Sequence, residues 1–225
     1  MLIKRKMNPR KFKIFFMMLI FLIVCTNTYG ADVDMVLNDI EQNMKNVKTV
    51  RAEFVQKKTM AMFDMPVTIN GKLFIENPDK FSWVVKNPIE YTLIVTKNRV
   101  KKWDPSNGVH ELSLKKNPMF KAMIEQITFW FSGSYASCKN DYHIELLHGD
   151  SNKSDESGES ILLRFTPKEH NQTSKMLSSI TLSFENNKKY ISKIQLLEKN
   201  SDITEIIFKK TIINSEIDKS VWEIN

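Results

Sequence analysis

Cysteine and glycine, which often fix small folds and catalytic loops, are scarce in this sequence. The 225 residues include two cysteines, and Cys25 falls in an N-terminal segment that we expect to be removed. The other, Cys138, then has no partner for an internal disulfide. About 190 residues would remain, enough to form a hydrophobic core without covalent cross-links. We therefore expect a fold that is stabilised by the burial of apolar side chains.

Residue patterns typical of catalysis are also missing. The six glycines are not grouped, which argues against a glycine-rich loop that holds phosphate. No serine occupies a glycine-flanked nucleophile turn, and His110-Glu111 has no second histidine at zinc-protease spacing. We expect no enzyme, no metal and no cofactor. The alternative is a small hydrolase, which would need a serine and an acid near one of the histidines, His110, His143 or His170.

The clearest long apolar run lies near the N-terminus. Six Lys and Arg residues between positions 4 and 13 precede it. The run from Ile14 to Cys25 has about a dozen residues, fewer than the roughly 20 that span a bilayer. We therefore predict a cleaved signal peptide over residues 1–30, followed by a single domain over residues 31–225. The competing interpretation is a retained membrane anchor.

The net charge gives no indication of nucleic-acid binding once this segment is set aside. It contains six of the 33 Lys and Arg residues and none of the 26 Asp and Glu residues. The rest of the chain has 27 bases against 26 acids, a net charge of +1. The sequence pI of about 9.2 thus describes the N-terminal segment.

The remaining sequence predicts one helix followed mainly by strands. Apolar residues recur at three- and four-residue steps from Val33 to Val47, which indicates an amphipathic helix. The stretch from Val50 to Trp83 has the alternation of three consecutive antiparallel strands, and Gly71 within it indicates a bend or a close approach of another segment. We predict strands over residues 49–58, 67–75, 80–86, 91–96, 100–103, 109–114, 142–147, 160–166, 180–184, 190–197 and 203–213.

Two connecting segments are unusually apolar. Residues 59–65 contain Met60, Met62, Phe63 and Met65, so this loop either tucks over the core or forms an adaptable flap over a ligand site. The segment that begins at Pro118 has helical spacing, which fits a core helix or a lid over an apolar cavity. Its apolar face consists of Phe120, Met123, Ile124, Ile127, Trp130 and Phe131.

The supply of large apolar side chains is high, with 14 Phe, 12 Met and 4 Trp. A twisted antiparallel sheet has a concave face that must be covered, and incomplete covering leaves a cavity. Binding an acyl chain is a reasonable use of such a cavity, because each CH₂ group moved out of water contributes about 0.8 kcal/mol. Composition permits this function without requiring it.

The order of residues narrows the possibilities. Phe54-x-Gln56, Gly71-x-Leu73, Pro78-x-x-Phe81-x-Trp83 and Pro88 follow the short helix and the N-terminal segment. This succession resembles the periplasmic outer-membrane lipoprotein carrier family of Gram-negative bacteria (LolA-type). The resemblance implies a mainly β (α+β) fold, namely an unclosed antiparallel β-barrel of about eleven strands with helices covering the open concave face.

The resemblance also implies a function and partners. Such proteins are soluble periplasmic carriers that shield the acyl chains of lipoproteins on the way to the outer membrane. They receive cargo from an inner-membrane ABC transporter and pass it to an outer-membrane acceptor, and we expect a monomer. By position, the lipid-binding cavity would contain Phe54, Leu73, Phe81, Trp83, Trp103, Met123, Ile127 and Trp130.

One position departs from the family pattern. The residue before the turn proline is typically an arginine that links the sheet to the lid and helps to control cargo release, and here it is Asn77. Asn77 is therefore a candidate for release control. A glycolipid or another lipid-linked product is an alternative cargo, and a non-carrier envelope sensor or scaffold of the same fold is an alternative function.

Overall fold

The described part of the protein begins within the predicted signal peptide. A computed structural model describes residues 28–63, 65–97, 99–113, 118–147, 161–185 and 189–224. Residues 1–27 of the predicted signal peptide lie outside these ranges, and residues 28–30 belong to the first helix, α2 (Thr28–Met44). The division of the chain into a cleaved segment and one domain stays a prediction.

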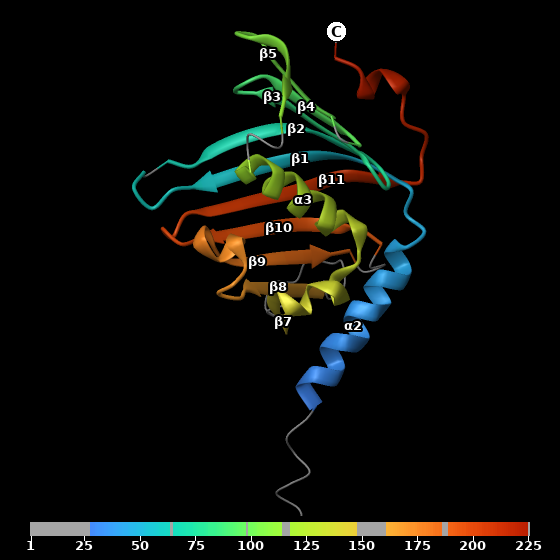
Figure 1. The fold of residues 1–225 in the computed structure, drawn as a ribbon, viewed down its shortest axis with the longest axis vertical. Helices are drawn as coiled ribbons and strands as arrows, with labels where there is room; N and C mark the ends of the chain where they lie inside the picture. Colours follow the sequence, from blue (N-terminus) through green and yellow to red (C-terminus); the bar gives the residue numbers. More distant parts are fainter. Residues whose placement is uncertain are drawn as a thin grey trace, which may run out of the picture.

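Eleven antiparallel strands form one curved sheet in the order β6-β5-β4-β3-β2-β1-β11-β10-β9-β8-β7 (Figure 1). β1 pairs with both β2 and β11, so two meanders meet at the centre of the sheet. In the described ranges β6 and β7 remain as separate edges, which confirms the unclosed barrel. The strands are β1 (Thr49–Thr59), β2 (Val67–Glu76), β3 (Lys80–Asn87), β4 (Tyr91–Thr96), β5 (Arg99–Asp104), β6 (Gly108–Leu112), β7 (Tyr142–Leu147), β8 (Ile161–Pro167), β9 (Leu177–Phe184), β10 (Ile191–Glu198) and β11 (Ile203–Ile213).

Every predicted strand overlaps an observed one. The alternation of apolar and polar residues carried this prediction, because one face of the sheet is buried and the other is largely solvated. Two Asn-Pro pairs, Asn77-Pro78 and Asn87-Pro88, mark the ends of β2 and β3. Proline ends a strand here because it has no N–H group to donate to a neighbouring strand.

Two helices cover the concave face and one edge. α3 (Pro118–Ser132) connects β6 to β7 and crosses the concave face (Figure 1). α2 packs along β7 and the 3₁₀ helix η1 (Tyr135–Asn140), at the edge of the sheet, and so makes a less central contact than the amphipathic pattern predicted. A second 3₁₀ helix, η2 (Gln172–Lys175), precedes β9.

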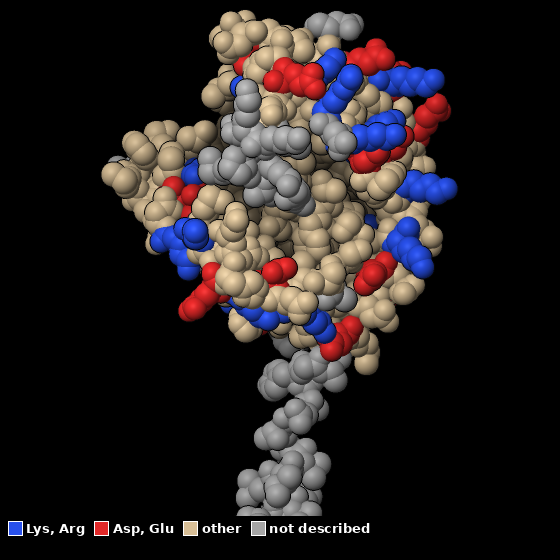
Figure 2. Space-filling view, viewed as in Figure 1, with Lys and Arg blue, Asp and Glu red and all other residues tan. Residues whose placement is uncertain are grey.

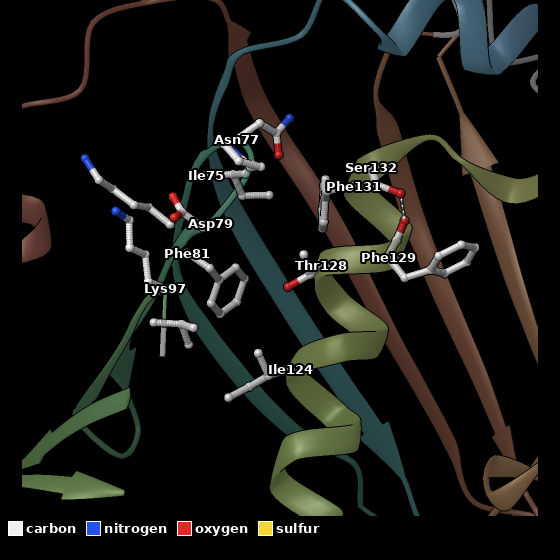
Figure 3. A pocket seen from close by; sticks show the side chains of 13 residues that line it. Ile75, Asn77, Asp79, Phe81, Lys97, Ile124, Thr128, Phe129, Phe131 and Ser132 are labelled. Atoms are coloured by element: carbon white, nitrogen blue, oxygen red, sulfur yellow. Dashed lines mark hydrogen bonds between the residues drawn. The ribbon is translucent and has the colours of Figure 1, made fainter. Parts of the chain in front are cut away.

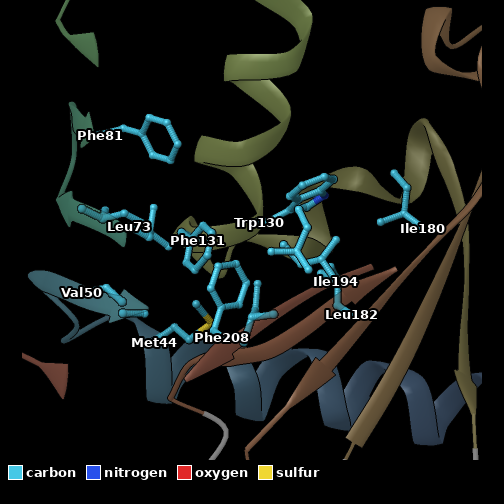
Figure 4. Packing of buried hydrophobic residues seen from close by; sticks show 14 of the residues in the cluster. Met44, Val50, Leu73, Phe81, Trp130, Phe131, Ile180, Leu182, Ile194 and Phe208 are labelled. Atoms are coloured by element: carbon cyan, nitrogen blue, oxygen red, sulfur yellow. The ribbon is translucent and has the colours of Figure 1, made fainter. Parts of the chain in front are cut away.

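The hydrophobic core fills the space between the concave face and the helices (Figure 4). Phe131 of α3 packs edge-on against Phe208 of β11, with ring centroids 5.5 Å apart. Met44 reaches the same region from α2. Because side chains of one strand face alternate sides, the buried set repeats at every second residue, as in Val50, Ala52 and Phe54 of β1.

The C-terminal segment returns to the sheet. Its 3₁₀ helix, η3 (Lys219–Trp222), contacts β3, and the ammonium group of Lys80 lies 5.5 Å from the centroid of the Trp222 ring. This is a cation–π distance. The prediction that the tail docks on the body through Val221 and Trp222 is confirmed for this element.

The β1–β2 connection differs from both sequence interpretations. Met62 is 90% exposed, Phe63 63% and Met65 79%, so this loop does not tuck over the core. It also takes no part in lining the cavity described below. The sequence could not decide this, because a Met-rich loop is equally typical of a covered and of an uncovered position.

Two properties concern the described residues alone. Within them, each helix is too short or too polar to cross a bilayer. They also contain no group of three His, Cys, Asp or Glu side chains that could hold a metal ion.

Candidate functional site

A cavity of about 490 Å³ separates part of α3 from the β2–β4 region of the concave face (Figure 3). It lies at the end of the sheet where β2 turns into β3 and β4 turns into β5. Its lining residues are Ile75, Asn77, Pro78, Asp79, Lys80, Phe81, Val95, Lys97, Ile124, Thr128, Phe129, Phe131 and Ser132.

The two facing walls of the cavity are apolar. Ile75 pairs with Phe81, and Phe81 pairs with Val95, so these three side chains stand side by side on the concave face. Ile124 and Phe131 are seven residues apart on α3 and therefore share one side of the helix. Figure 3 shows Phe81, Ile124 and Phe131 directed into the space between the helix and the sheet.

Charged and polar groups gather at the two turns. The N–H of Lys97 donates to the carbonyl of Asp79 at 3.0 Å, which joins the β4–β5 turn to the β2–β3 turn. Lys80 pairs with Glu76 at 2.9 Å. Figure 2 shows the same division at larger scale, with charged side chains around the periphery of this face and mostly uncharged atoms toward its centre. The arrangement suits an amphiphile whose apolar part enters the cavity.

Asn77 fixes the β2–β3 turn to the connection between α2 and β1. Its side-chain amide donates to the carbonyl of Val47 at 2.8 Å, and its backbone N–H donates to the carbonyl of Lys48 at 2.8 Å. Both bonds lead away from α3, although Asn77 lines the cavity together with Ser132 of that helix. The predicted role of Asn77 in cargo release stays a prediction.

Four predicted site residues come together on the concave face. Phe54 stacks on Trp83 with ring centroids 3.8 Å apart, and Phe81 lies 6.1 Å from Trp83. Leu73 pairs with Trp83 in the adjacent strand. Phe81 lines the cavity, whereas Phe54, Leu73 and Trp83 are buried in the core next to it.

Gly71 makes the aromatic stack possible. A Cβ atom at this position would lie 2.1 Å from the carbonyl oxygen of Val84 and 2.5 Å from Cζ of Phe54. The strand register also shifts between Asn70 and Gly71, as at a β-bulge. Both sequence expectations for Gly71, a bend and a close approach, are confirmed.

The C-terminal end of α3 is held firmly. Gly133 follows the helix with φ of +76°, and a Cβ atom there would lie 2.7 Å from Cβ of Met44. The hydroxyl of Tyr135 donates to the carbonyl of Trp130 and lies 3.8 Å from Sδ of Met44. These contacts tie α3 to η1 and α2 at the end where the helix closes the cavity.

The other predicted residues of α3 are placed as follows. Trp130 is buried in the core, and Ile127 is half-buried and packs against it. Met123 lies within α3, but its side chain lies outside the described part of the molecule. A further hydrogen bond, from the hydroxyl of Tyr142 to Oε1 of Gln126 at 2.9 Å, connects the middle of α3 to β7.

The assignment of Trp103 to the cavity is corrected by the strand register. Trp103 pairs with Thr92 and Val109, whereas the concave face of β4 and β5 carries Leu93 and Val100. Because Val100 and Trp103 are three residues apart in one strand, their side chains point to opposite faces. Trp103 therefore lies on the convex face.

The sequence analysis missed several lining residues. Ile75 has the same strand parity as Leu73, and this signal could have identified it. Val95 depends on the β3–β4 register, and Thr128 and Phe129 depend on how α3 rotates against the sheet. Neither the register nor the rotation is fixed by local sequence.

The histidines lie apart in the described residues. His110 is in the edge strand β6 and His143 in the opposite edge strand β7. His170 is 3.3 Å from Asp141, and both side chains are exposed. His148 lies outside the described ranges. The placed histidines give the hydrolase alternative no shared site.

Comparison with known proteins is consistent with the fold. Residues 45–225 match the family described as "Outer membrane lipoprotein carrier protein LolA". An outer-membrane lipoprotein carrier protein of Nitrosospira multiformis is 24% identical over 102 residues, which are 45% of this chain and 46% of that protein. The chain thus matches about half the length of this curated relative.

Two solved structures share the fold at low sequence identity. MucB has a TM-score of 0.55 and 10% identity, over 87% of this chain and 63% of that chain. A structure of the Pseudomonas aeruginosa MucA/MucB complex has a TM-score of 0.51 and 11% identity, over 86% of this chain and 61% of that chain. Since the family match extends over most of the sequence, from residue 45 to residue 225, this chain belongs to the outer membrane lipoprotein carrier protein LolA family.

Proposed function

We propose that the protein is a carrier that shields the acyl chains of a lipidated cargo in the cavity between α3 and the β2–β4 face. The observation that carries the proposal is the pairing of apolar walls with a charged rim in one cavity. Its volume of about 490 Å³ falls within the range of roughly 300–1,000 Å³ typical of ligand pockets. The function involves binding and release, with no catalytic step.

The walls and the rim have separate roles in this proposal. Phe81, Ile124 and Phe131 take the hydrocarbon, where each buried CH₂ group contributes about 0.8 kcal/mol. The polar part of the cargo stays at the rim near Asp79 and Lys97 and remains hydrated. Affinity then rises with chain length, whereas the headgroup has a smaller effect.

α3 is the element that would move to admit a longer chain. Its buried face covers Phe81 and the core beside it, and its C-terminal end is fixed through Gly133 and Tyr135. A swing about this end would uncover the concave face as far as Trp83. The second sequence interpretation of this helix, a lid, is the one that the proposal adopts.

The setting follows from family membership. We propose a periplasmic monomer that takes lipoproteins, or alternatively a glycolipid or other lipid-linked product, toward the outer membrane. Its donor would be an inner-membrane ABC transporter and its recipient an outer-membrane acceptor.

Uptake of a fluorescent fatty-acyl probe tests the cavity. Phe81→Glu should weaken probe binding at least about tenfold, because a carboxylate on an apolar wall must be desolvated. Phe81→Leu keeps the wall apolar and should bind nearly as well as the unmodified protein. Ile212→Glu, at a residue 42% exposed, introduces the same charge elsewhere and should have no effect.

A second variant separates loss of the cavity from loss of the fold. Thr128 lies on the exposed side of the cavity, so Thr128→Trp can fill the space without burying a charge. It should reduce uptake while the circular dichroism spectrum and the unfolding midpoint stay unchanged. Probe affinity that is unaltered in both Phe81→Glu and Thr128→Trp would contradict the proposal.

Release is expected to depend on Asn77. Asn77→Ala removes the hydrogen bond to Val47, worth about 1 kcal/mol, and should speed probe dissociation about fivefold by loosening the β2–β3 turn. Stopped-flow displacement measures this rate. The matched control is Asn107→Ala, which removes an amide of the β5–β6 turn, outside the cavity. Equal dissociation rates in the two variants would remove Asn77 from the release step.

The alternative function is a protein-binding module of the same fold, and the filled core favours it. Phe54 and Leu73 are 1% and 0% exposed, so the concave face beyond the cavity has no free space in this conformation. Lipid extraction and mass spectrometry of the native protein distinguish the two functions. A carrier yields bound lipid, and a filled binding module yields none.

A further inference from the structure

The tip of the β1–β2 hairpin projects apolar side chains into solvent. The apolar tip consists of Met62, Phe63, Met65 and Val67, which are 90%, 63%, 79% and 46% exposed. Figures 1 and 2 show the hairpin standing out on the left side of the molecule, with few charged atoms at its end. Large apolar groups at a projecting point are unfavourable in water unless they have a partner.

The base of this hairpin is fixed, so the exposure belongs to the fold. Lys58 pairs with Glu198 at 2.7 Å and with Asp202 at 3.7 Å. The carboxylate of Asp202 also accepts from the N–H of Ala61 at 2.9 Å. β1 remains paired with β2 and β11 up to Lys58. These contacts hold the tip away from the body.

The same end of the sheet carries two more exposed apolar side chains. Ile89, in the β3–β4 turn, is 64% exposed, and Met176, just before β9, is 46% exposed. Antiparallel pairing places both turns at the end where β1 finishes, opposite the cavity and Asn77. The apolar groups are thus separate points on projecting turns.

The size and charge of this surface decide between a protein and a bilayer as its partner. A stable protein interface uses about 20–30 residues on each side, far more than the four residues of the tip. Insertion between lipid headgroups needs a few apolar side chains and adapts to separate points. Charges not described as ion-paired nearly cancel among the residues of these turns, namely Lys86, Lys175 and Lys199 against Asp64, Glu90 and Glu169.

We propose that the apolar tip inserts into the interfacial region of a lipid bilayer and anchors this end of the molecule reversibly. The near balance of charge makes the attraction hydrophobic, so it should persist on zwitterionic lipid and at high salt. The cavity, at the other end of the strands, then faces away from that bilayer. This anchoring is independent of whether the cavity binds lipid.

Vesicle flotation tests the proposal with the protein in the form in which cells export it. The triple variant Met62→Ser, Phe63→Ser, Met65→Ser should lower partitioning onto phosphatidylcholine vesicles at least about tenfold. Met35→Ser removes a methionine that is 70% exposed on α2, away from the tip, and should leave partitioning unchanged. Equal partitioning of the triple variant and the unmodified protein would overturn the proposal.

Site-specific labelling identifies the part that enters the lipid. Burial, together with the nearby Asp141, raises the pKa of Cys138 to about 12, so this thiol should not react at neutral pH. In a Cys25→Ser background, Met62→Cys can carry a polarity-sensitive fluorophore, with Met35→Cys as the control. The emission of the label at position 62, and not at 35, should shift to the blue when vesicles are added.

The remaining outcomes also decide. An unshifted label at position 62 on vesicle-bound protein would overturn the proposal, because contact would then occur elsewhere. Unchanged vesicle binding with loss of a protein contact in the triple variant would assign the tip to a protein partner instead. Probe uptake by the cavity should be the same in the triple variant, which keeps this test separate from that of the carrier function.

Discussion

Gly71→Ala should lower the free energy of unfolding by about 3 kcal/mol, at the upper end of the range for overpacking a closely packed site. The added methyl group would meet the carbonyl oxygen of Val84 at 2.1 Å and Cζ of Phe54 at 2.5 Å. The first contact is with backbone, which can yield only if β2 and β3 separate. The second pushes the Phe54 ring off Trp83.

Urea unfolding followed by far-UV circular dichroism measures this loss, and near-UV circular dichroism reports on the aromatic stack. Gly108→Ala is the matched control, because Gly108 has φ of +65° and a Cβ atom there meets nothing within 4 Å. It should cost about 1 kcal/mol from backbone strain alone. Equal losses in the two variants would show that crowding at Gly71 is not the cause.

The Gly71 site also illustrates what sequence could predict. Alternation in β1 to β3 placed Phe54, Phe81 and Trp83 on one face, and a glycine inside a strand indicated close approach. All of this is local information. The stacking of Phe54 on Trp83 across β2 depends on the bulge beside Gly71, which the pattern of residues does not specify.

Trp103 shows how a residue type can outweigh a reliable pattern. Strand parity with Val100 already placed it on the convex face, but its large aromatic ring favoured the cavity in the prediction. The exposed Met62 and Phe63 show the reverse problem, since apolar type alone predicts burial. In both cases the error arises because composition was used where geometry decides.

The cavity could be predicted only in part for a different reason. Its sheet wall follows from strand parity, but its helical wall depends on the docking of α3, which is separated from β2 by about forty residues and contacts it only after folding. Ile124 and Phe131 were recognised as one apolar face of a helix. Their position opposite Phe81 is a tertiary fact.

Tyr135→Ala should be as damaging as any single substitution near the cavity, with a loss of about 4 kcal/mol in the free energy of unfolding. The side chain is completely buried, and its ring lies 5.5 to 5.8 Å from those of Phe129, Phe165 and Phe184. Burial raises the pKa of Tyr135 well above its ordinary range, so the hydroxyl stays protonated and continues to donate to Trp130. Removing this side chain leaves a void among α3, η1 and β8–β9.

Tyr135→Phe separates the hydrogen bond from the packing. It keeps the ring contacts and leaves the Trp130 carbonyl without its donor, which should cost about 1–2 kcal/mol. Since that carbonyl belongs to the last turn of α3, the helix end should loosen even though the core remains filled. In the carrier proposal, probe exchange should therefore be faster in Tyr135→Phe than in the unmodified protein at equal occupancy. Faster exchange with a small loss of stability would identify this end of α3 as the hinge, whereas unchanged exchange would place the moving part elsewhere.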